Sequence, residues 1–421
     1  MRIRENQGRE TPVYIAIRRT RQILFIGAPF GSFFGELASA IESRGGRVWR
    51  AVTQGGEFVE TPRHCRIVMR RPLDDWQDRI EEVMRRRDID TIVTFNDALP
   101  LSRKALDVAE RLQVRRFVLE NGYLRPFWVT LERDGANGYS RLPRDLSVYL
   151  SPEFSGAASV EHVAFRTGFR PHVKNTMMHF AAAAAMSPML PFDPKYYGDS
   201  IWSQAQGYVS EAIWRAGNDE SEAIDRLQTF AKTGRRIFLC LMQKPGDKQL
   251  VVHSEYGGNV RFLDEVIRCF AACAPDDAVM AVKQHPLDYG AERCPEQVAT
   301  LARCLGVADR IIYLRKTTID AVMPLAKAVL TINSTAGLAA MVEGLPVICL
   351  GRAFYAIPGL TFEGSLAEFW SDPRPPRPDA VRGFVAYLKS TSQINGGFHT
   401  PEGRSLLTPK VAGILVDDPR R

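Results

Sequence analysis

Short apolar runs of strand length alternate with amphipathic stretches of helix length in two separate parts of the chain. In the first part the apolar runs lie at 22–26, 47–52, 91–95 and 116–119. In the second part they lie at 236–242, 278–282, 311–314, 328–332 and 346–350. Repeated strand–helix units of this kind build a mainly parallel, doubly wound sheet. A chain of 421 residues is long enough for two such domains.

The composition changes between and after the two alternating parts, and these changes set the predicted boundaries. The predicted segments are a basic tail at 1–20, a first domain at 21–155, a helical connector at 156–234, a second domain at 235–372, and a linker, closing helix (379–389) and tail at 373–421. The predicted fold class is α/β, with two doubly wound, Rossmann-like domains facing a cleft. This is the GT-B-like arrangement of glycosyltransferases and nucleotide-sugar epimerases, and by itself it does not select a reaction.

The charge and the cysteines narrow the class of protein. A formal net charge of +7 favours acidic partners such as a phosphorylated substrate, anionic lipid or nucleic acid. Nucleic acid is the least favoured, because no basic recognition helix or aromatic-interleaved basic strand stands out. The seven cysteines lack paired short spacings, which indicates reduced thiols in a cytoplasmic protein. Cys269 and Cys273 lie one helical turn apart without a second ligand pair, so we predict no metal site.

Membrane-spanning and secretory segments are not expected. No stretch approaches eighteen consecutive apolar residues, and the arginine-rich start of the chain lacks the apolar region of a signal peptide.

Polar side chains follow two strands of the predicted second sheet. Lys283 and His285 come directly after the strand at 278–282, and Asn333, Ser334 and Thr335 join another strand to a helix. Ligands of doubly wound sheets bind beyond the carboxyl ends of the strands. A helix N-terminus offers free N–H groups and a dipole that favour phosphate. An imidazole can hydrogen-bond or protonate a departing phosphate. We therefore predict a cleft for an anionic ligand that carries a nucleotide.

Other loops at the same predicted rim have less specific patterns. The loop from Gln243 to Gln249 contains Asp247, and His253 follows it; a plain charged loop would look the same. Glu120 and Asp97 end strands of the first sheet, where paired carboxylates could serve as nucleophile or base, or could cap the following helices. The glycine loop at 27–31 lacks the G-x-G-x-x-G spacing of a dinucleotide site. Asp88-Ile-Asp90 lies before a strand, away from the predicted rim, and is not expected to bind metal.

Many motifs resemble, in order, the capsule polysaccharide biosynthesis family, and in particular its single-module β-Kdo transferases that start the glycolipid linker of exported bacterial capsules. The motifs lie at 25–34, 120–126, 128–132, 137–140, 243–249, 253–254, 283–288, 333–338, 357–362 and 393–398. The resemblance implies a retaining transferase that moves Kdo from CMP-Kdo to a lyso-phosphatidylglycerol-type acceptor, without a cofactor. It also implies a cytoplasmic protein, peripheral at the inner face of the membrane, that could contact other capsule-assembly proteins.

The resemblance also assigns roles to residues. The first domain is the acceptor side and the second binds the CMP-sugar. The implied catalytic residues are Glu120, Asp97 and His285. The implied donor-binding residues are Gln243, Asp247, Gln249, His253, Lys283, His285, Pro286, Asn333, Ser334 and Thr335. The implied acceptor-side residues are Gly27, Phe30, Gly31, Asn121, Tyr123 and Arg125.

The chain departs from the family pattern at its expected nucleophile. Relatives commonly carry two acidic residues before Gly-Tyr or Gly-Phe, whereas this chain has Glu120 followed by Asn121. Leu99 and Ser102 replace the usual Arg and His. Either Glu120 or Asp97 takes the role of nucleophile, or activity is altered. Two further hypotheses therefore stand beside the transferase: a non-catalytic capsule-assembly subunit that binds the glycolipid or partner transferases, and another nucleotide-sugar enzyme on the same fold, such as an epimerase.

Overall fold

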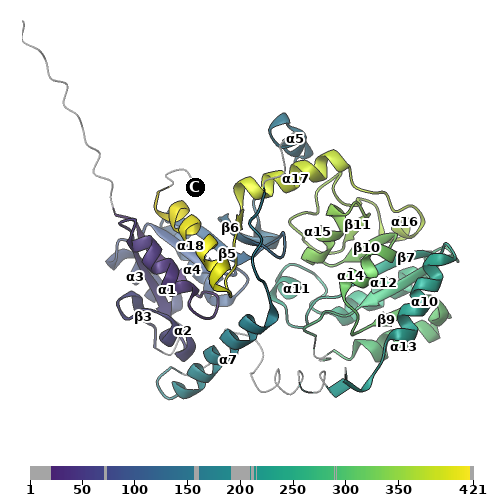
Figure 1. The fold of residues 1–421 in the computed structure, drawn as a ribbon, viewed down its shortest axis with the longest axis horizontal. Helices are drawn as coiled ribbons and strands as arrows, with labels where there is room; N and C mark the ends of the chain where they lie inside the picture. Colours follow the sequence, from purple (N-terminus) through teal and green to yellow (C-terminus); the bar gives the residue numbers. More distant parts are fainter. Residues whose placement is uncertain are drawn as a thin grey trace, which may run out of the picture.

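Two α/β domains lie side by side in the computed structural model, each built around its own sheet (Figure 1). The structure describes residues 20–70, 74–155, 161–190, 209, 213–214, 216–288, 290 and 292–417, so most of the predicted basic tail lies outside the described residues. The GT-B-like fold predicted from the sequence is confirmed.

Over the described residues, the first sheet has seven strands in the order β12-β6-β5-β4-β1-β2-β3. Its parallel strands are β1 (Gln22–Ile26), β2 (Arg47–Val52), β3 (Arg66–Val68), β4 (Thr91–Phe95) and β5 (Arg115–Asn121). Two antiparallel strands, β6 (Trp128–Arg133) and β12 (Gln393–Asn395), extend the sheet beyond β5. The parallel part has the 3-2-1-4-5 order of a doubly wound sheet, with its switch point between β1 and β4.

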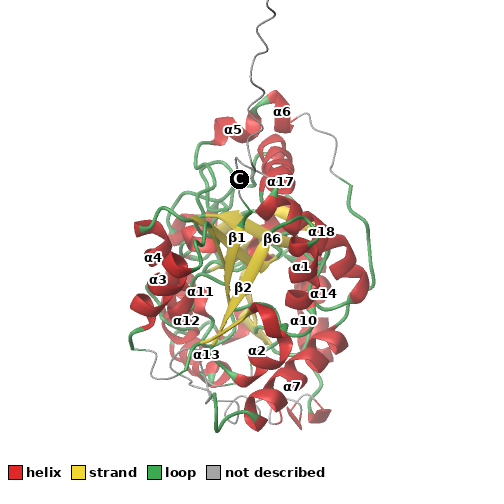
Figure 2. Ribbon diagram, turned by 90° about the vertical axis from the view of Figure 1, so that its left-hand side faces the viewer, coloured by secondary structure: helices red, strands yellow, loops and turns green. Residues whose placement is uncertain are grey.

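Helices cover both faces of the first sheet, as Figure 2 shows. On one face lie α3 (Trp76–Arg86) and α4 (Pro100–Arg111), and on the other α1 (Phe33–Glu42) and α18 (Pro401–Val416). The spacing of Trp76, Ile80 and Met84 places all three on one side of α3, where each is buried. The remaining short elements of this domain are α2 (Gly55–Glu60) and the 3-10 turns Arg63–Cys65 and Asn137–Tyr139.

The second sheet has five parallel strands over the described residues, in the order β11-β10-β7-β8-β9. The strands are β7 (Arg236–Leu241), β8 (Ala278–Lys283), β9 (Ile311–Leu314), β10 (Ala328–Thr331) and β11 (Val347–Cys349). The helices are α10 (Ser221–Lys232), α11 (Lys248–Val252), α12 (Asn259–Cys273), α13 (Cys294–Cys304), α14 (Ile319–Val322), α15 (Thr335–Val342) and α16 (Leu366–Ser371), with 3-10 turns at Ala308–Arg310 and Met323–Leu325. This sheet repeats the 3-2-1-4-5 order, and its switch point lies between β7 and β10.

The C-terminal segment crosses back to the first domain. Helix α17 (Pro378–Thr391) packs on the core of the second domain together with α5 (Leu146–Leu150) and near α6 (Pro152–Ser155). The chain then adds β12 to the first sheet, and α18 packs beside α1 (Figure 1). The single closing helix and tail predicted for 373–421 were therefore incomplete. β12 has only three residues, and Pro409 inside α18 interrupts the helical pattern.

The predicted helical connector is divided between the domains. Residues 161–168 have no regular structure, and α7 (Phe169–Ala185) packs on α2 of the first domain. Helix α10 instead packs against β7 and β9 of the second. The predicted break at Ser187–Pro194 begins just after α7, but 191–194 lie outside the described residues. Within the described part of the chain, none of the helices has the length and hydrophobicity needed to span a bilayer.

Substitution of Leu407 tests how much the C-terminal segment contributes to the stability of the first domain. Its side chain is fully buried on α18, in the cluster that also holds Phe33 and Leu37. We expect Leu407→Ala to lower the free energy of unfolding by roughly 2–5 kcal/mol, because it leaves a cavity in that core. Urea denaturation measures the change. Exposed Ser405 on the same helix is the control, and Ser405→Ala is expected to change stability by less than about 0.5 kcal/mol. Equal stability of both variants would show that α18 is not part of this core.

Candidate functional site

A pocket of about 540 Å³ lies where the carboxyl ends of the two sheets face each other. We call it the cleft pocket. The first domain lines it with Asn96, Glu120, Asn121, Tyr123, Arg125 and Asn137. The second domain lines it with Leu241, Met242, Gln243, Asp247, Lys283, Gln284, His285, Pro286, Ile319, Asp320, Met323, Asn333, Ser334, Thr335, Ala336 and Ala339. Both of the stretches predicted to form an anion site are therefore in one cavity.

The wall contributed by the second domain is built at the switch point of its sheet. Gln243 follows β7, and Asn333 follows the neighbouring strand β10. The Asn333 N–H donates to Gln243 Oε1 at 3.3 Å, which joins the two loops. Ser334 is the N-cap of α15, and its hydroxyl accepts from Ala336 N at 3.2 Å. The positive end of the α15 dipole therefore faces the pocket, as predicted for a phosphate site.

Lys283 and His285, at the end of β8 and just after it, line the same wall of the pocket. Lys283 is buried, and its ammonium donates to the backbone carbonyl of Gln284. His285 Nδ1 accepts from Leu287 N at 3.0 Å. Burial lowers the pKa of His285 to about 4, and the cations Arg125, Lys283 and Lys244 lower it further. At neutral pH the ring is uncharged with its proton on Nε2, so it can donate a hydrogen bond but is a poor source of a proton.

Glu120 faces this wall from the end of β5. Its Oε1 accepts from Asn121 N at 3.0 Å, while Oε2 is shielded from solvent and has no hydrogen-bond partner. Burial raises the pKa of Glu120 to about 7, helped by the negative charges of Asp97 and Asp247. Asp247 comes from the second domain, so carboxylates from both domains interact in the pocket. A carboxyl with a pKa near neutrality can exchange a proton or attack as an anion.

Asp97, the other predicted catalytic carboxylate, lies beneath the pocket and not in its wall. It is fully buried, and its Oδ2 accepts from Ala136 N at 2.8 Å. Its neighbour Asn96, which has a positive φ of 66°, lines the pocket instead. Burial raises the pKa of Asp97 to about 6. The structure therefore supports Asp97 as a residue that positions the loop after β6, through Ala136, rather than as a nucleophile.

Tyr123 connects the two domains at the edge of the pocket. Its ring stacks on Phe354 of the second domain, with 3.8 Å between centroids, and its hydroxyl accepts from Asn137 N at 2.7 Å. Glu132 lies behind it, and burial raises the pKa of Glu132 to about 8. This third buried carboxyl was not predicted from the sequence.

The remaining predicted residues divide into two groups. Asp247 and Pro286 line the pocket, whereas the side chain of Gln249 lies outside the described residues. His253 is buried at the domain junction, where its ring packs edge-on against Tyr139 at 4.5 Å. The glycine loop does not line the cleft pocket: Phe30 stacks on His179 at 3.9 Å, and Gly31 N donates to Glu60 at 2.9 Å.

Several pocket residues were given no role by reasoning from the sequence. Asn96 was expected at this rim, beside Asp97 at the end of a predicted strand. Asp320 was missed, because it lies in the helix that follows the strand at 311–314. Asn137 follows antiparallel β6, which was not predicted as a strand. A cluster of possible metal ligands within the described residues, Glu42, His64 and Cys65, lies on the first domain and lines no part of the cleft pocket.

A second cavity of about 390 Å³ adjoins the cleft pocket and shares Asn121 and Arg125 with it. We call it the side pocket. Much of its lining is aromatic or apolar: Pro126, Trp128, Val129, Phe165, Leu287 and Phe398. His172 and His399 are also in its wall, with 3.1 Å between Nδ1 and Nε2, and burial lowers the pKa of both rings. The side pocket is thus a largely uncharged space that opens next to Glu120.

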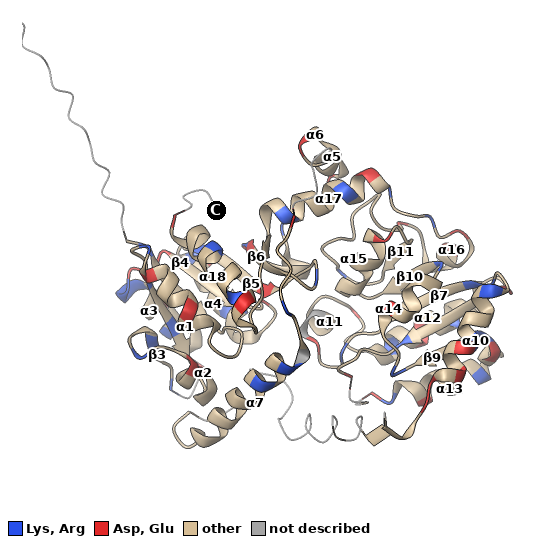
Figure 3. Cartoon of the chain, in the orientation of Figure 1, with Lys and Arg blue, Asp and Glu red and all other residues tan. Residues whose placement is uncertain are grey.

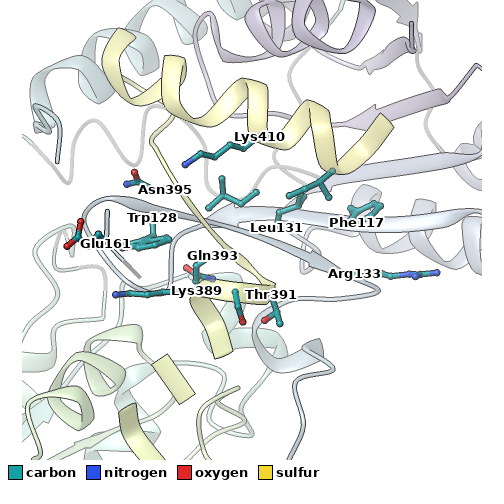
Figure 4. Close-up of a pocket in the computed structure, with 13 residues that line it drawn as sticks. Phe117, Trp128, Leu131, Arg133, Glu161, Lys389, Thr391, Gln393, Asn395 and Lys410 are labelled. Atoms are coloured by element: carbon teal, nitrogen blue, oxygen red, sulfur yellow. The ribbon is translucent and has the colours of Figure 1, made fainter. Parts of the chain in front are cut away.

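A third hollow, of about 440 Å³, lies at the edge of the first sheet between β6, β12 and α18 (Figure 4). Arg133, Lys389 and Lys410 surround its apolar floor, and Lys389 lies 5.4 Å from the centre of the Trp128 ring. It shares no lining residue with the cleft pocket, so we do not include it in the site.

The three carboxyls with raised pKa values predict how stability depends on pH. Asp97, Glu120 and Glu132 have pKa values raised to about 6, 7 and 8, above the value of about 4 expected in the unfolded chain. The folded state therefore binds more protons, and its stability is full below about pH 4 and is lost as the pH rises through about 6, 7 and 8. We expect urea midpoints to fall over this range.

Glu132→Gln separates this effect from general changes with pH. The variant removes one titrating group, so the fall in stability is expected to shrink, by up to about 1.4 kcal/mol per pH unit where Glu132 titrates. Glu110→Gln is the control, because the hydrogen bond from Arg116 lowers the pKa of exposed Glu110 and places its titration below this range. An unchanged slope in Glu132→Gln would contradict the assignment.

Comparison with known proteins shows the family to which the chain belongs. The family model described as capsule polysaccharide biosynthesis protein matches residues 90–399. The capsule polysaccharide export protein KpsS of Escherichia coli is 28% identical over 382 residues, covering 90% of this chain and 97% of that protein. The capsule polysaccharide modification protein LipB of Neisseria meningitidis serogroup B is 29% identical over 399 residues, covering 91% and 93%.

Among solved structures, Thermosulfurimonas dismutans KpsC, described as a beta Kdo 2,7 transferase, aligns with a TM-score of 0.43 and 12% sequence identity, covering 94% of this chain and 98% of that one. The family match spans more than half of the chain and confirms the resemblance seen in the ordered motifs. This protein therefore belongs to the capsule polysaccharide biosynthesis protein family.

Proposed function

We propose that this protein is a retaining glycosyltransferase that moves Kdo from CMP-Kdo to a lyso-phosphatidylglycerol-type lipid in capsule polysaccharide biosynthesis and export. The observation that carries the proposal is the cleft pocket, where a phosphate-binding wall faces Glu120 next to an apolar side pocket. Family membership supports the pathway, and the motif resemblance to β-Kdo transferases supports the sugar. On this proposal the protein acts without a cofactor, peripherally at the cytoplasmic face of the membrane, where other capsule-assembly proteins could be its partners.

The donor would bind at the switch point of the second sheet. The N-terminus of α15 and Lys283 supply positive potential for the CMP phosphate. Neutral His285 can donate from Nε2 to a phosphate oxygen, which stabilises the charge that develops as CMP leaves. Gln243, which is hydrogen-bonded to Asn333, keeps the two phosphate-binding loops together.

Glu120 is the proposed nucleophile. Its ionised carboxylate attacks the anomeric carbon of Kdo, and the bond from that carbon to the CMP phosphate breaks with its electron pair going to the phosphate oxygen. The acceptor hydroxyl then attacks the same carbon, its proton passes to Asp247, and the bond to Glu120 breaks. Two displacements retain the configuration of the anomeric carbon. Because the attacking form is ionised, kcat is expected to rise with pH through about 7.

Asn121 favours a second function. It lines both pockets at the position where relatives commonly carry the second acidic residue, and an amide cannot act as the nucleophile. A non-catalytic subunit would bind CMP, detected as a rise in melting temperature, without turnover. A rise with a uridine nucleotide but not with CMP would instead select another nucleotide-sugar enzyme, such as an epimerase.

The transferase proposal is tested by incubating the protein with CMP-Kdo and lyso-phosphatidylglycerol and measuring product by mass spectrometry. We expect Glu120→Gln to lower kcat about 10³-fold, because the amide removes the attacking charge. His285→Ala is expected to lower it about 10²-fold through loss of a hydrogen-bond donor. Glu110→Gln makes the same chemical change at an exposed position and should retain activity.

Two outcomes would overturn these assignments. Absence of product from the wild-type protein would remove the enzymatic claim, and full activity in both pocket variants would remove the site. A Kdo adduct on the peptide containing Glu120, trapped by acid quenching, would identify the nucleophile directly.

The side pocket is the proposed site for the apolar part of the acceptor. It joins the cleft pocket at Arg125, whose exposed guanidinium suits the acceptor phosphate, and Phe165 forms part of its wall. We expect Phe165→Ala to raise the KM for the lipid acceptor about tenfold through lost apolar contact, with the affinity for CMP unchanged. Phe154→Ala, a partly buried phenylalanine on α6, is the control. Equal KM values for both variants would exclude the side pocket as the acceptor site.

A further inference from the structure

Helix α7 is attached to the first domain by one face only. On this inner face His179 Nδ1 lies 3.0 Å from Glu60 Oε1, in a buried pair. The helices α2 and α7 are in close contact, since a Cβ added at Gly55 or Gly56 would lie 2.5 Å from Met186 or His179. The contacts that hold α7 on the first domain therefore come from its inner face.

The outer face of α7 is a single exposed stripe. Its positions recur at spacings of three and four residues, which places them on one side of a helix. The stripe consists of Arg170, Lys174, Met177, Met178, Ala181, Ala184 and Ala185. The side of a surface helix that faces water normally carries polar residues. Here two cations occupy the first turns and the rest is apolar, with Met177 67% and Met178 61% exposed.

Several of the most exposed apolar side chains lie on α7 or beside it. In the described part of the chain, the large hydrophobic residues that are more than half exposed are Val59, Val163, Met177, Met178, Met189, Val209 and Ile213. Met177 and Met178 lie on α7, Met189 follows it by four residues, and Val59 lies on α2, which packs against α7. Clustered exposure of this kind marks an interaction surface.

The charged residues on α7 and in the flanking stretch of chain are all positive. Residues 162–190 contain Arg166, Arg170 and Lys174 and no aspartate or glutamate. Figure 3 shows positively charged residues toward one end of α7 and none of negative charge along it. Cations beside exposed apolar side chains are complementary to a surface that has negative charges outside and an apolar layer beneath them.

We propose that the outer face of α7 binds an anionic lipid bilayer, with the helix lying in the plane of the interface. Met177, Met178 and the alanines would enter the boundary between headgroups and acyl chains, while Arg170 and Lys174 contact lipid phosphates. His172, on the inner face of the same helix, lines the side pocket, so that pocket lies directly behind the proposed membrane-binding helix. The purpose of the contact rests on the proposed function, but the binding itself does not.

Sedimentation of the full chain with lipid vesicles, in the absence of substrates, tests whether the outer face of α7 binds a bilayer. The probe is vesicles of phosphatidylethanolamine and phosphatidylglycerol, compared with vesicles of phosphatidylcholine alone. Wild type is expected to sediment with the anionic vesicles, and Met177→Glu/Met178→Glu to lose at least about tenfold in affinity. Arg170→Glu/Lys174→Glu is expected to lose a similar factor, which shrinks at high salt.

The control is Val260→Glu/Val342→Glu, which places the same charges at valines that are 40% and 42% exposed on the second domain. It should bind vesicles as wild type does. Wild type that stays in solution, or Met177→Glu/Met178→Glu that binds normally, overturns the proposal. Self-association of wild type that this variant abolishes also overturns it, since the stripe would then be a protein interface. Vesicle binding without transferase activity would reject the proposed function alone.

Discussion

The stacking of Tyr123 on Phe354 is the contact on which the geometry of the cleft depends. The two rings come from different domains, lie 3.8 Å apart and are inclined by 19°. Close by, Tyr139 packs on His253, and the guanidinium of Arg144 donates to backbone carbonyls of the second domain. These contacts lie at the facing ends of the sheets, so they set the separation of the pocket walls directly.

The repeated topology explains why the chemistry collects between the domains. Both sheets have the 3-2-1-4-5 strand order, in which neighbouring loops diverge at the switch point and leave a crevice. Gln243 and Asn333 stand on either side of this point in the second sheet. In the first sheet the corresponding loops hold Gly27 and Asn96, but the one after β1 is occupied by the packing of Phe30 on His179. The cleft pocket and the side pocket therefore remain open next to Asn121 and Arg125, whereas the space at the glycine loop is filled.

Burial of carboxyls is the electrostatic feature that sets this first-domain wall apart. Burial raises the pKa of Asp97, Glu120 and Glu132, and the negative charge of Asp97 raises the pKa of Glu120 and of Glu132 further. Burying these carboxyls lowers the stability of the folded state at high pH. Perturbed pKa values of this kind are typical of functional sites that need a group with a pKa of about 7. On the opposite wall, the same burial keeps His285 neutral among cations. The two walls thus differ in character: one presents hydrogen-bond donors and a helix N-terminus, and the other a carboxyl whose pKa is near neutrality.

The sequence by itself determined the two doubly wound domains and most of the second-domain wall. Strands such as 278–283 are buried on both faces and read as continuous apolar runs, and the residues that follow them must lie at one rim. Only the tertiary structure decided which residues of the first domain reach the pocket. Asp97 and Asn96 are adjacent, yet the left-handed backbone at Asn96 turns one side chain into the cavity and the other beneath it. The return of β12 and α18 to the first sheet, and the side pocket behind Asn121, were also invisible in the sequence, because they depend on contacts between residues hundreds of positions apart.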